Sequence, residues 1–123
     1  MTDYVAGSCN IGPSEIHRRY QVAITGGVIY LVFLLFIIFN GGSNIVRLAS
    51  FLPAMLASVG FIQARRRFCF AYGLAGVLNF GKAGDVSKVS DPAALAADRA
   101  YAIKIILMSV ASASVMSALL FVI

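Results

Sequence analysis

Charged residues are scarce in this sequence, at 12% of its 123 residues, while 60% of the residues are hydrophobic. Three stretches contain no charged residue at all: residues 22–39, 48–62 and 105–123. Transport of ions or protons usually depends on ionisable groups inside the apolar segments. Their absence disfavours a transporter, including a small multidrug exporter built around a membrane carboxylate.

Metal ligands and nucleophiles are also few, because the chain has one histidine, His17, and two cysteines, Cys9 and Cys69. No C-x-x-C pair occurs, which excludes a zinc ribbon and a thioredoxin-like motif. The three residues could bind a metal if they met at one membrane interface, with Glu15 or an aspartate as the fourth ligand that zinc usually needs. The simpler interpretation is two ordinary thiols, with Cys69 packed as a small hydrophobic residue.

The uncharged stretches have the length of membrane spans. The first has 18 residues and the third 19, about 27–29 Å as helices, against about 30 Å for a bilayer's hydrocarbon core. The second reaches this length over about residues 45–64 if the Arg47 side chain extends to the headgroups. The stretches lack the two-residue alternation of barrel strands. We therefore predict an all-α integral membrane protein with three transmembrane helices.

We predict that residues 1–123 form one membrane domain. Pro13 suits the first turn of a helix, and Glu15 in that turn complements the helix dipole. The first apolar stretch is long for a signal peptide and no small-x-small cleavage pattern follows it, so we expect it to be retained. The expected segments are a cytoplasmic tail (1–13), a lead-in and first span (14–39), a second span in a helical hairpin with the first (44–64), an interfacial segment and connector (65–90), and a long helix containing the third span (92–122).

Residues 68–81 are strongly apolar but, at 14 residues, short for a membrane span. An interfacial or re-entrant position on the cytoplasmic face is expected, and a fourth span is the alternative. The preceding arginines would stop the second span at the headgroups or attract anionic lipid, and the aromatic side chains would anchor the segment at headgroup depth. The candidate contacts to lipid or a partner are Arg65, Arg66, Arg67, Phe68, Phe70, Tyr72 and Phe80.

The basic residues predict how the chain is oriented. Nine of the ten lie on the same side as the N-terminus, and only Arg47 lies near the other side. Because lysine and arginine resist translocation, we expect a cytoplasmic N-terminus and a periplasmic C-terminus. The net charge of +5 is then explained without nucleic-acid binding. Both cysteines would face the cytoplasm, where thiols stay reduced, so no structural disulfide is expected.

Small residues recur every third or fourth position in the second and third stretches. In lipid, helices associate through close packing at such residues and through hydroxyl hydrogen bonds. In contrast, residues 28–39 are nearly all large, which predicts contact with lipid or with another protein's apolar surface. The candidate helix-packing residues are Ala57, Gly60, Ala64, Ser109, Ala113 and Ser117.

Two segments carry a resemblance to known proteins: residues 9–16 (CNIGPSEI) followed by Arg18 and Arg19, and residues 61–81 (FIQARRRFCFAYGLAGVLNFG) followed by Asp91, Asp98 and Arg99. They resemble a group of small bacterial membrane proteins of unassigned function. The resemblance covers most of the chain and implies a bacterial inner membrane. It implies no activity.

No catalytic, metal or cofactor signature stands out in the sequence. We therefore expect a small accessory subunit or assembly factor of a larger bacterial inner-membrane complex, such as a respiratory or photosynthetic one, that is not an enzyme and needs no cofactor. The alternative is a membrane carrier of haem, pigment or metal ligated by His17 or a cysteine. A thiol enzyme using Cys9 or Cys69 is a third hypothesis, with no recognisable base besides His17.

Overall fold

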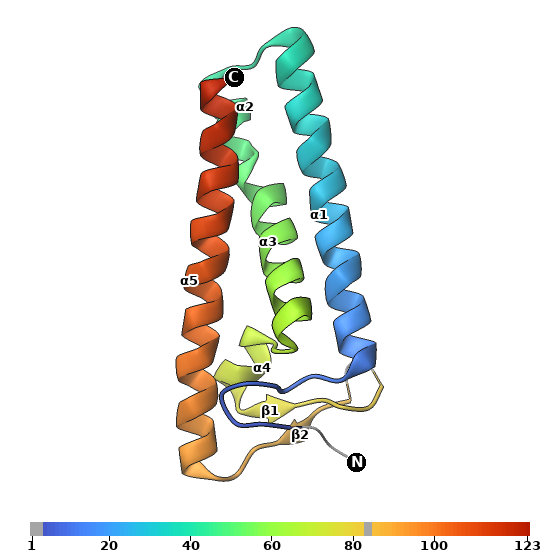
Figure 1. Ribbon diagram of the computed structural model, residues 1–123, viewed down its shortest axis with the longest axis vertical. Coiled ribbons are helices and arrows are strands. Elements are labelled where there is room, and N and C mark those ends of the chain that lie inside the picture. The colour runs from blue at the N-terminus through green and yellow to red at the C-terminus, as the bar shows by residue number, and fades with distance from the viewer. Residues whose placement is uncertain (1–3, 83–84) are drawn as a thin grey trace.

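The computed structural model describes residues 4–82 and 85–123, and 74% of these residues are helical. The long helices run side by side, with a smaller folded unit at one end (Figure 1). We call this unit the cap; it comprises residues 4–12 and, as far as they are described, residues 68–90, with α4, β1 and β2. The elements in chain order are α1 (Pro13–Asn40), α2 (Asn44–Ala49), α3 (Phe51–Arg66), α4 (Phe70–Ala75), β1 (Val77–Leu78), β2 (Ser87–Lys88) and α5 (Pro92–Val122).

Among the described residues, three helical segments are long and apolar enough to cross a membrane: α1, α5 and the pair α2 and α3 over Asn44–Arg66. The three membrane-length helices predicted from the apolar stretches are therefore confirmed. The chain leaves the cap along α1, returns along α2 and α3, and leaves again along α5 (Figure 1). The described N-terminal residues and the C-terminus consequently lie at opposite ends of the bundle.

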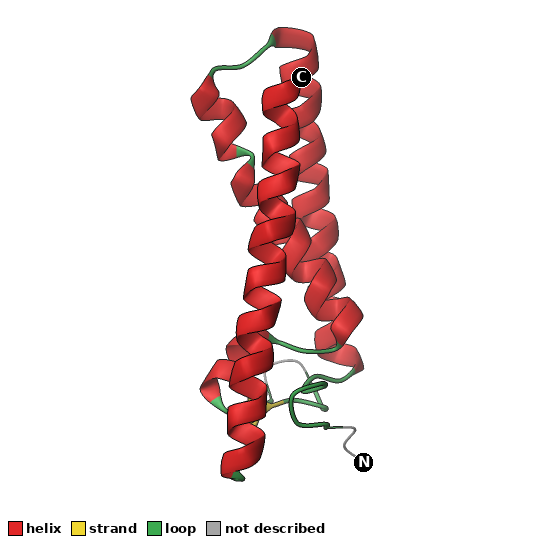
Figure 2. Cartoon of the chain, turned by 60° about the vertical axis from the view of Figure 1, so that its left-hand side comes forward, coloured by secondary structure: helices red, strands yellow, loops and turns green. Residues whose placement is uncertain are grey.

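The second membrane-length segment is interrupted at Ser50, where the sequence predicted one helix (Figure 2). Pro53 explains the break, because proline has no N–H to donate and its ring clashes with the carbonyl four residues earlier. The Ser50 hydroxyl donates to the Arg47 carbonyl oxygen at 2.5 Å, and the Ser117 hydroxyl of α5 donates to the same oxygen at 3.4 Å. Two serine side chains thus hydrogen-bond a backbone carbonyl at the break, which also accepts from the Ser50 N–H at 3.3 Å.

Helices α1 and α3 approach each other at two glycines. A Cβ atom on Gly26 would lie 2.4 Å from the backbone nitrogen of Ala57, and one on Gly60 would lie 2.7 Å from that of Ala23. Next to the first contact, a Cβ atom on Gly27 would have no atom of another helix within 4 Å. The close approach therefore depends on one glycine of each helix, as expected where small residues let membrane helices pack.

Helix α5 buries a single stripe that runs along its whole length. The stripe recurs every three or four residues, the spacing of one helix face. It includes three of the small residues that we predicted to pack between helices, Ser109, Ala113 and Ser117. The buried positions are Ala94, Asp98, Ala102, Ile105, Ser109, Ala113, Ser117 and Leu120.

The chain reverses sharply where α3 ends. Arg67 adopts a left-handed conformation with φ 54°, and the Phe68 N–H donates to the Gln63 carbonyl oxygen at 3.1 Å, which is the six-to-one bond of a Schellman motif. The turn directs Phe68 inward. Its ring is fully buried and packs edge-to-face on Tyr101, with 4.8 Å between ring centroids. We predicted that Phe68 contacts lipid or a partner, but its ring is buried within the chain itself.

The segment over residues 68–81 folds into α4 and β1 beneath the long helices (Figure 1). Helix α4 has six residues, about 9 Å in length, which is too short to span a bilayer. Strand β1 pairs antiparallel with β2, with Val77 opposite Lys88 and Leu78 opposite Ser87. The fourth-span alternative is therefore not supported, and an interfacial or re-entrant position remains a prediction.

Candidate functional site

The N-terminal residues are held between two segments that follow much later in the chain. The Asn10 N–H donates to the Arg67 carbonyl oxygen at 3.1 Å, and the Asn10 carbonyl accepts from the Asn79 N–H at 2.9 Å. The Asn10 side chain pairs with the backbone of Cys69, accepting from its N–H at 2.7 Å and donating to its carbonyl at 3.2 Å. The Gly12 N–H then donates to the Asn79 carbonyl at 2.8 Å. This chain end is thus built into the cap.

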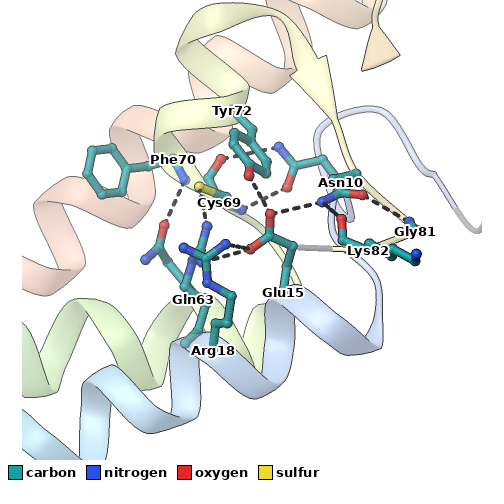
Figure 3. Close-up of polar contacts among 11 residues, drawn as sticks. Asn10, Glu15, Arg18, Gln63, Cys69, Phe70, Tyr72, Gly81 and Lys82 are labelled. Carbon is teal, nitrogen blue, oxygen red and sulfur yellow. Dashed lines mark hydrogen bonds and ion pairs between the residues drawn. The ribbon is translucent and has the colours of Figure 1, made fainter. Parts of the chain in front are cut away.

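Glu15 lies in the first turn of α1 and is fully buried (Figure 3). One carboxylate oxygen accepts from Arg19 at 3.1 Å and from Arg18 at 3.3 Å. The other accepts from the Asn79 side-chain amide at 2.9 Å and from the Tyr72 hydroxyl. A buried carboxylate is tolerated when it is paired and hydrogen-bonded in this way. Glu15 therefore does more than complement the helix dipole.

Arg19 extends this network to the turn between α3 and α4. Its side chain is only 13% exposed, and its second terminal nitrogen donates to the Cys69 sulfur at 3.1 Å. The guanidinium also lies 5.8 Å from the centre of the Tyr72 ring. Burial raises the pKa of Tyr72, and the hydrogen bond to Glu15 raises it further. We call the network the clasp, and it consists of Asn10, Glu15, Arg19, Cys69, Tyr72 and Asn79.

The contacts of the clasp are suited to stabilising the position of the cap against α1. No buried side-chain nitrogen or oxygen among the described residues lacks a hydrogen-bond partner. A general base must be within hydrogen-bond reach of the proton that it removes, whereas both oxygens of Glu15 face donors of the protein itself. The hydrogen bonds of the clasp join the start of α1 to the cap.

The predicted metal ligands do not come together as a metal site. Cys9 and Cys69 are both buried, and neither forms a disulfide bond within the described part of the chain. Cys9 donates to the Ile11 carbonyl at 3.7 Å, while the Cys69 sulfur faces Arg19. His17 is exposed on α1. Within the part of the chain that the structure describes, no group of three or more histidine, cysteine, aspartate or glutamate residues could hold a metal ion.

A second buried carboxylate, Asp98 of α5, holds the first described residues. It accepts from the Tyr4 hydroxyl at 2.7 Å and from the Gly7 N–H at 2.7 Å. Desolvation raises the pKa of Tyr4, followed by the hydrogen bond to Asp98 and the negative charges of Asp98 and Asp91. The neutral tyrosine is therefore the form that fits this contact.

We expect the Tyr4 contact to weaken at alkaline pH. Because the folded pKa of Tyr4 lies above its unfolded value of about 10, the contact is at full strength below pH 10 and is lost as the pH rises through the folded value. Asp98→Asn should lower the pKa of Tyr4 toward 10, as followed by carbon NMR of labelled tyrosine rings. Asp85→Asn removes the same charge at an exposed position and should leave it unchanged; an equal shift in both variants would contradict the contact.

The remaining candidate residues were predicted either to contact lipid or a partner or to pack between helices. Of the first group, Phe70, Tyr72 and Phe80 are half-buried in the cap, and the three arginines at 65–67 are exposed at the end of α3. The second group comes from α3. Gly60 and Ala64 are buried, whereas Ala57 is half-buried. The residues that sequence reasoning did not place in a site are Asn10, Arg19, Asn79 and Asp98.

Comparisons with known proteins give no relative of this chain. No protein-family model matches it, and neither a curated protein nor a solved structure does. Its function therefore has to be inferred from the placement of its own residues.

Proposed function

We propose that this chain is a small, non-catalytic accessory subunit or assembly factor of a larger membrane complex. The observation that carries the proposal is the exposed surface of α1. Of its 18 most apolar consecutive residues, only 11% are buried within the chain, whereas the corresponding share is 28% in α5 and 28% in the segment Asn44–Arg66. Large apolar side chains are exposed along α1. Those exposed on α1 include Ile24, Val28, Leu31, Val32, Leu35, Phe36, Ile38 and Phe39.

Part of this surface is concave, which favours a protein neighbour over lipid alone. A groove of about 360 Å³ lies between α1 and α2. Membrane helices associate by van der Waals packing of complementary shapes, and a groove with only apolar side chains would accept the ridge of a neighbouring helix. Its lining residues are Val32, Phe33, Phe36, Ile45, Val46 and Ala49.

The charges support an orientation for the proposed subunit. Nine basic residues lie in the cap, at Arg67 where α3 ends, or in the halves of α1, α3 and α5 that are nearer to the cap. Arg47 lies near the other end, where it donates to the carbonyl oxygens of Gly42, at 3.1 Å, and Leu120. Because positively charged residues stay in the cytoplasm, we propose that the cap faces the cytoplasm. The resemblance noted above would place the protein in a bacterial inner membrane.

Site-specific photo-crosslinking in the native membrane tests the proposal. A photoreactive residue at Phe36, in the groove, should give one discrete adduct with another protein. The matched control is Leu107, which is exposed on α5 at 64% and should give lipid adducts only. The same complex should survive in mild detergent with a fixed ratio of the two chains. Lipid adducts alone at both positions, with a chain that migrates by itself, would exclude the accessory role.

A further inference from the structure

A second groove, of about 470 Å³, lies between α3 and α5 near the cap. Its volume is within the range of small-molecule sites, about 300–1,000 Å³. Unlike the groove on α1, it combines apolar and basic side chains. It is lined by Phe61, Ile62, Arg65, Arg66 and Met108.

The basic and apolar residues of this groove are separated along the helix axis. On α3, Arg65 follows Phe61 by four residues and Arg66 follows Ile62 by four, so each arginine lies about one helical turn, or 6 Å, closer to the cap. The arrangement brings charge to one end of the groove and hydrocarbon to the other. This is the order of groups that a phospholipid presents from its headgroup to its acyl chains.

Helix α5 repeats the same order from the opposite wall. Lys104 lies four residues on the cap side of Met108. Its ammonium group is 6.0 Å from the centre of the Tyr101 ring, and the Tyr101 hydroxyl accepts from Arg66 at 3.4 Å. Tyr101 itself packs on the buried ring of Phe68. A fixed aromatic ring thus lies between cations from both helices.

These cations have no carboxylate partner within the described part of the chain. The ion pairs found there join Glu15 to Arg18 and Arg19. Arg65 and Arg66 are exposed and lie next to apolar surface. Their charge is therefore available to an anion that arrives from outside the protein.

We propose that this groove is a binding site for an anionic phospholipid. Its phosphate would be bound by Arg65, Arg66 and Lys104, since guanidinium groups donate paired hydrogen bonds to phosphate. One acyl chain would lie on Phe61 and Met108. The apolar half of the groove distinguishes this ligand from a soluble phosphate. The site is independent of the proposed accessory role, because it lies between α3 and α5 and not on α1.

The absence of tryptophan from the chain allows a direct assay. Phe61→Trp places a single fluorescent reporter in the groove, and Leu107→Trp places one on another face of α5. Each protein is reconstituted in bilayers that contain brominated phosphatidylglycerol or, at the same mole fraction, brominated phosphatidylcholine. Quenching of the groove reporter should show a preference for the anionic lipid on the order of 100-fold, from three basic residues. The Leu107 reporter should show almost none.

Charge variants in the reporter protein separate a defined site from general attraction. R65Q/R66Q should reduce the preference roughly 30-fold. R67Q/K88Q removes the same charge from two exposed residues that do not line the groove, and should reduce it less than threefold, because exposed charges that do not contact the phosphate act on it only through solvent and salt, which screen them. Helix content measured by circular dichroism checks that both variants are folded.

Three results would overturn the proposal. Equal quenching by the two lipids would exclude a preference for anionic headgroups. Equal losses in R65Q/R66Q and R67Q/K88Q would show diffuse attraction in place of a site. Relief of quenching by millimolar glycerol phosphate would identify a phosphate site that does not use the acyl chain. Should R65Q/R66Q fail to fold, K104Q, at an exposed position of α5, provides the same comparison with R67Q alone.

Discussion

Glu15→Gln is expected to destabilise the cap by about 3–5 kcal/mol, the cost of removing one partner from a buried ion pair. The carboxylate is fully buried and accepts from Arg18, Arg19, Asn79 and Tyr72. An amide keeps one acceptor oxygen and turns an NH₂ group toward donors. Arg19, which is mostly buried, then retains a positive charge without its countercharge.

Amide hydrogen exchange measures the expected loss of stability at the residues of the cap. The amides of Asn10, Gly12 and Asn79 donate bonds that hold the N-terminal residues in the cap, and their protection should fall by at least about 100-fold. Amides in the middle of α5 should keep theirs. The matched variant Asp85→Asn removes an exposed carboxylate and should change none of these rates. Unchanged protection in Glu15→Gln would mean that the clasp does not hold the chain end.

The three long helices could be predicted because their signal is local. An uncharged stretch of about 20 residues specifies a membrane-length helix without information from the rest of the chain. Pro92 and Pro13 also mark helix starts by their own chemistry. The interruption at Ser50 was not predicted, although Pro53 lies in the sequence. Whether a proline bends or breaks a helix depends on its surroundings in the fold, and here the Arg47 carbonyl beside the break accepts from Ser117 of another helix.

The clasp could not be predicted, because its contacts join distant parts of the sequence. Glu15 meets Tyr72 across 57 positions and Asn79 across 64. These contacts depend on the reversal at Arg67, where a residue other than glycine is left-handed, and no local pattern indicates that conformation. The one available signal was the spacing of Glu15 from Arg18 and Arg19, three and four residues away, which predicts ion pairs on one helix face.

The same reversal explains why the aromatic segment was misassigned in part. A run of apolar and aromatic residues after an arginine cluster is typical of a membrane interface, and sequence alone does not separate residues that anchor from residues that fill a core. Phe68 fills the core because Gly73 leaves space for it: a Cβ on Gly73 would lie 2.8 Å from the Phe68 ring. The burial of the Phe68 ring therefore depends on Gly73, five positions later, and on contacts with α5.

Gly26→Ala is expected to destabilise the bundle by about 1–3 kcal/mol, the usual cost of adding a methyl group to a closely packed contact. The new Cβ would lie 2.4 Å from the backbone nitrogen of Ala57 and 2.9 Å from the carbonyl carbon of Leu56. Backbone atoms of a helix cannot rotate away as a side chain can. Helices α1 and α3 would have to separate, and the contacts of Gly60 with Ala23 would loosen with them.

Gly27→Ala is the matched control, because it adds the same methyl group to the next residue of the same helix, where no atom of another helix lies within 4 Å of it. Alanine favours a helix over glycine by about 1 kcal/mol, so this variant should be neutral or slightly more stable. Unfolding in mixed micelles, followed by circular dichroism, measures both. The two variants share the gain in helix propensity and in hydrophobicity, so their difference isolates the distance between α1 and α3. Equal stabilities would show that α1 does not pack on α3 through Gly26, and the free face assigned to α1 would then be wrong as well.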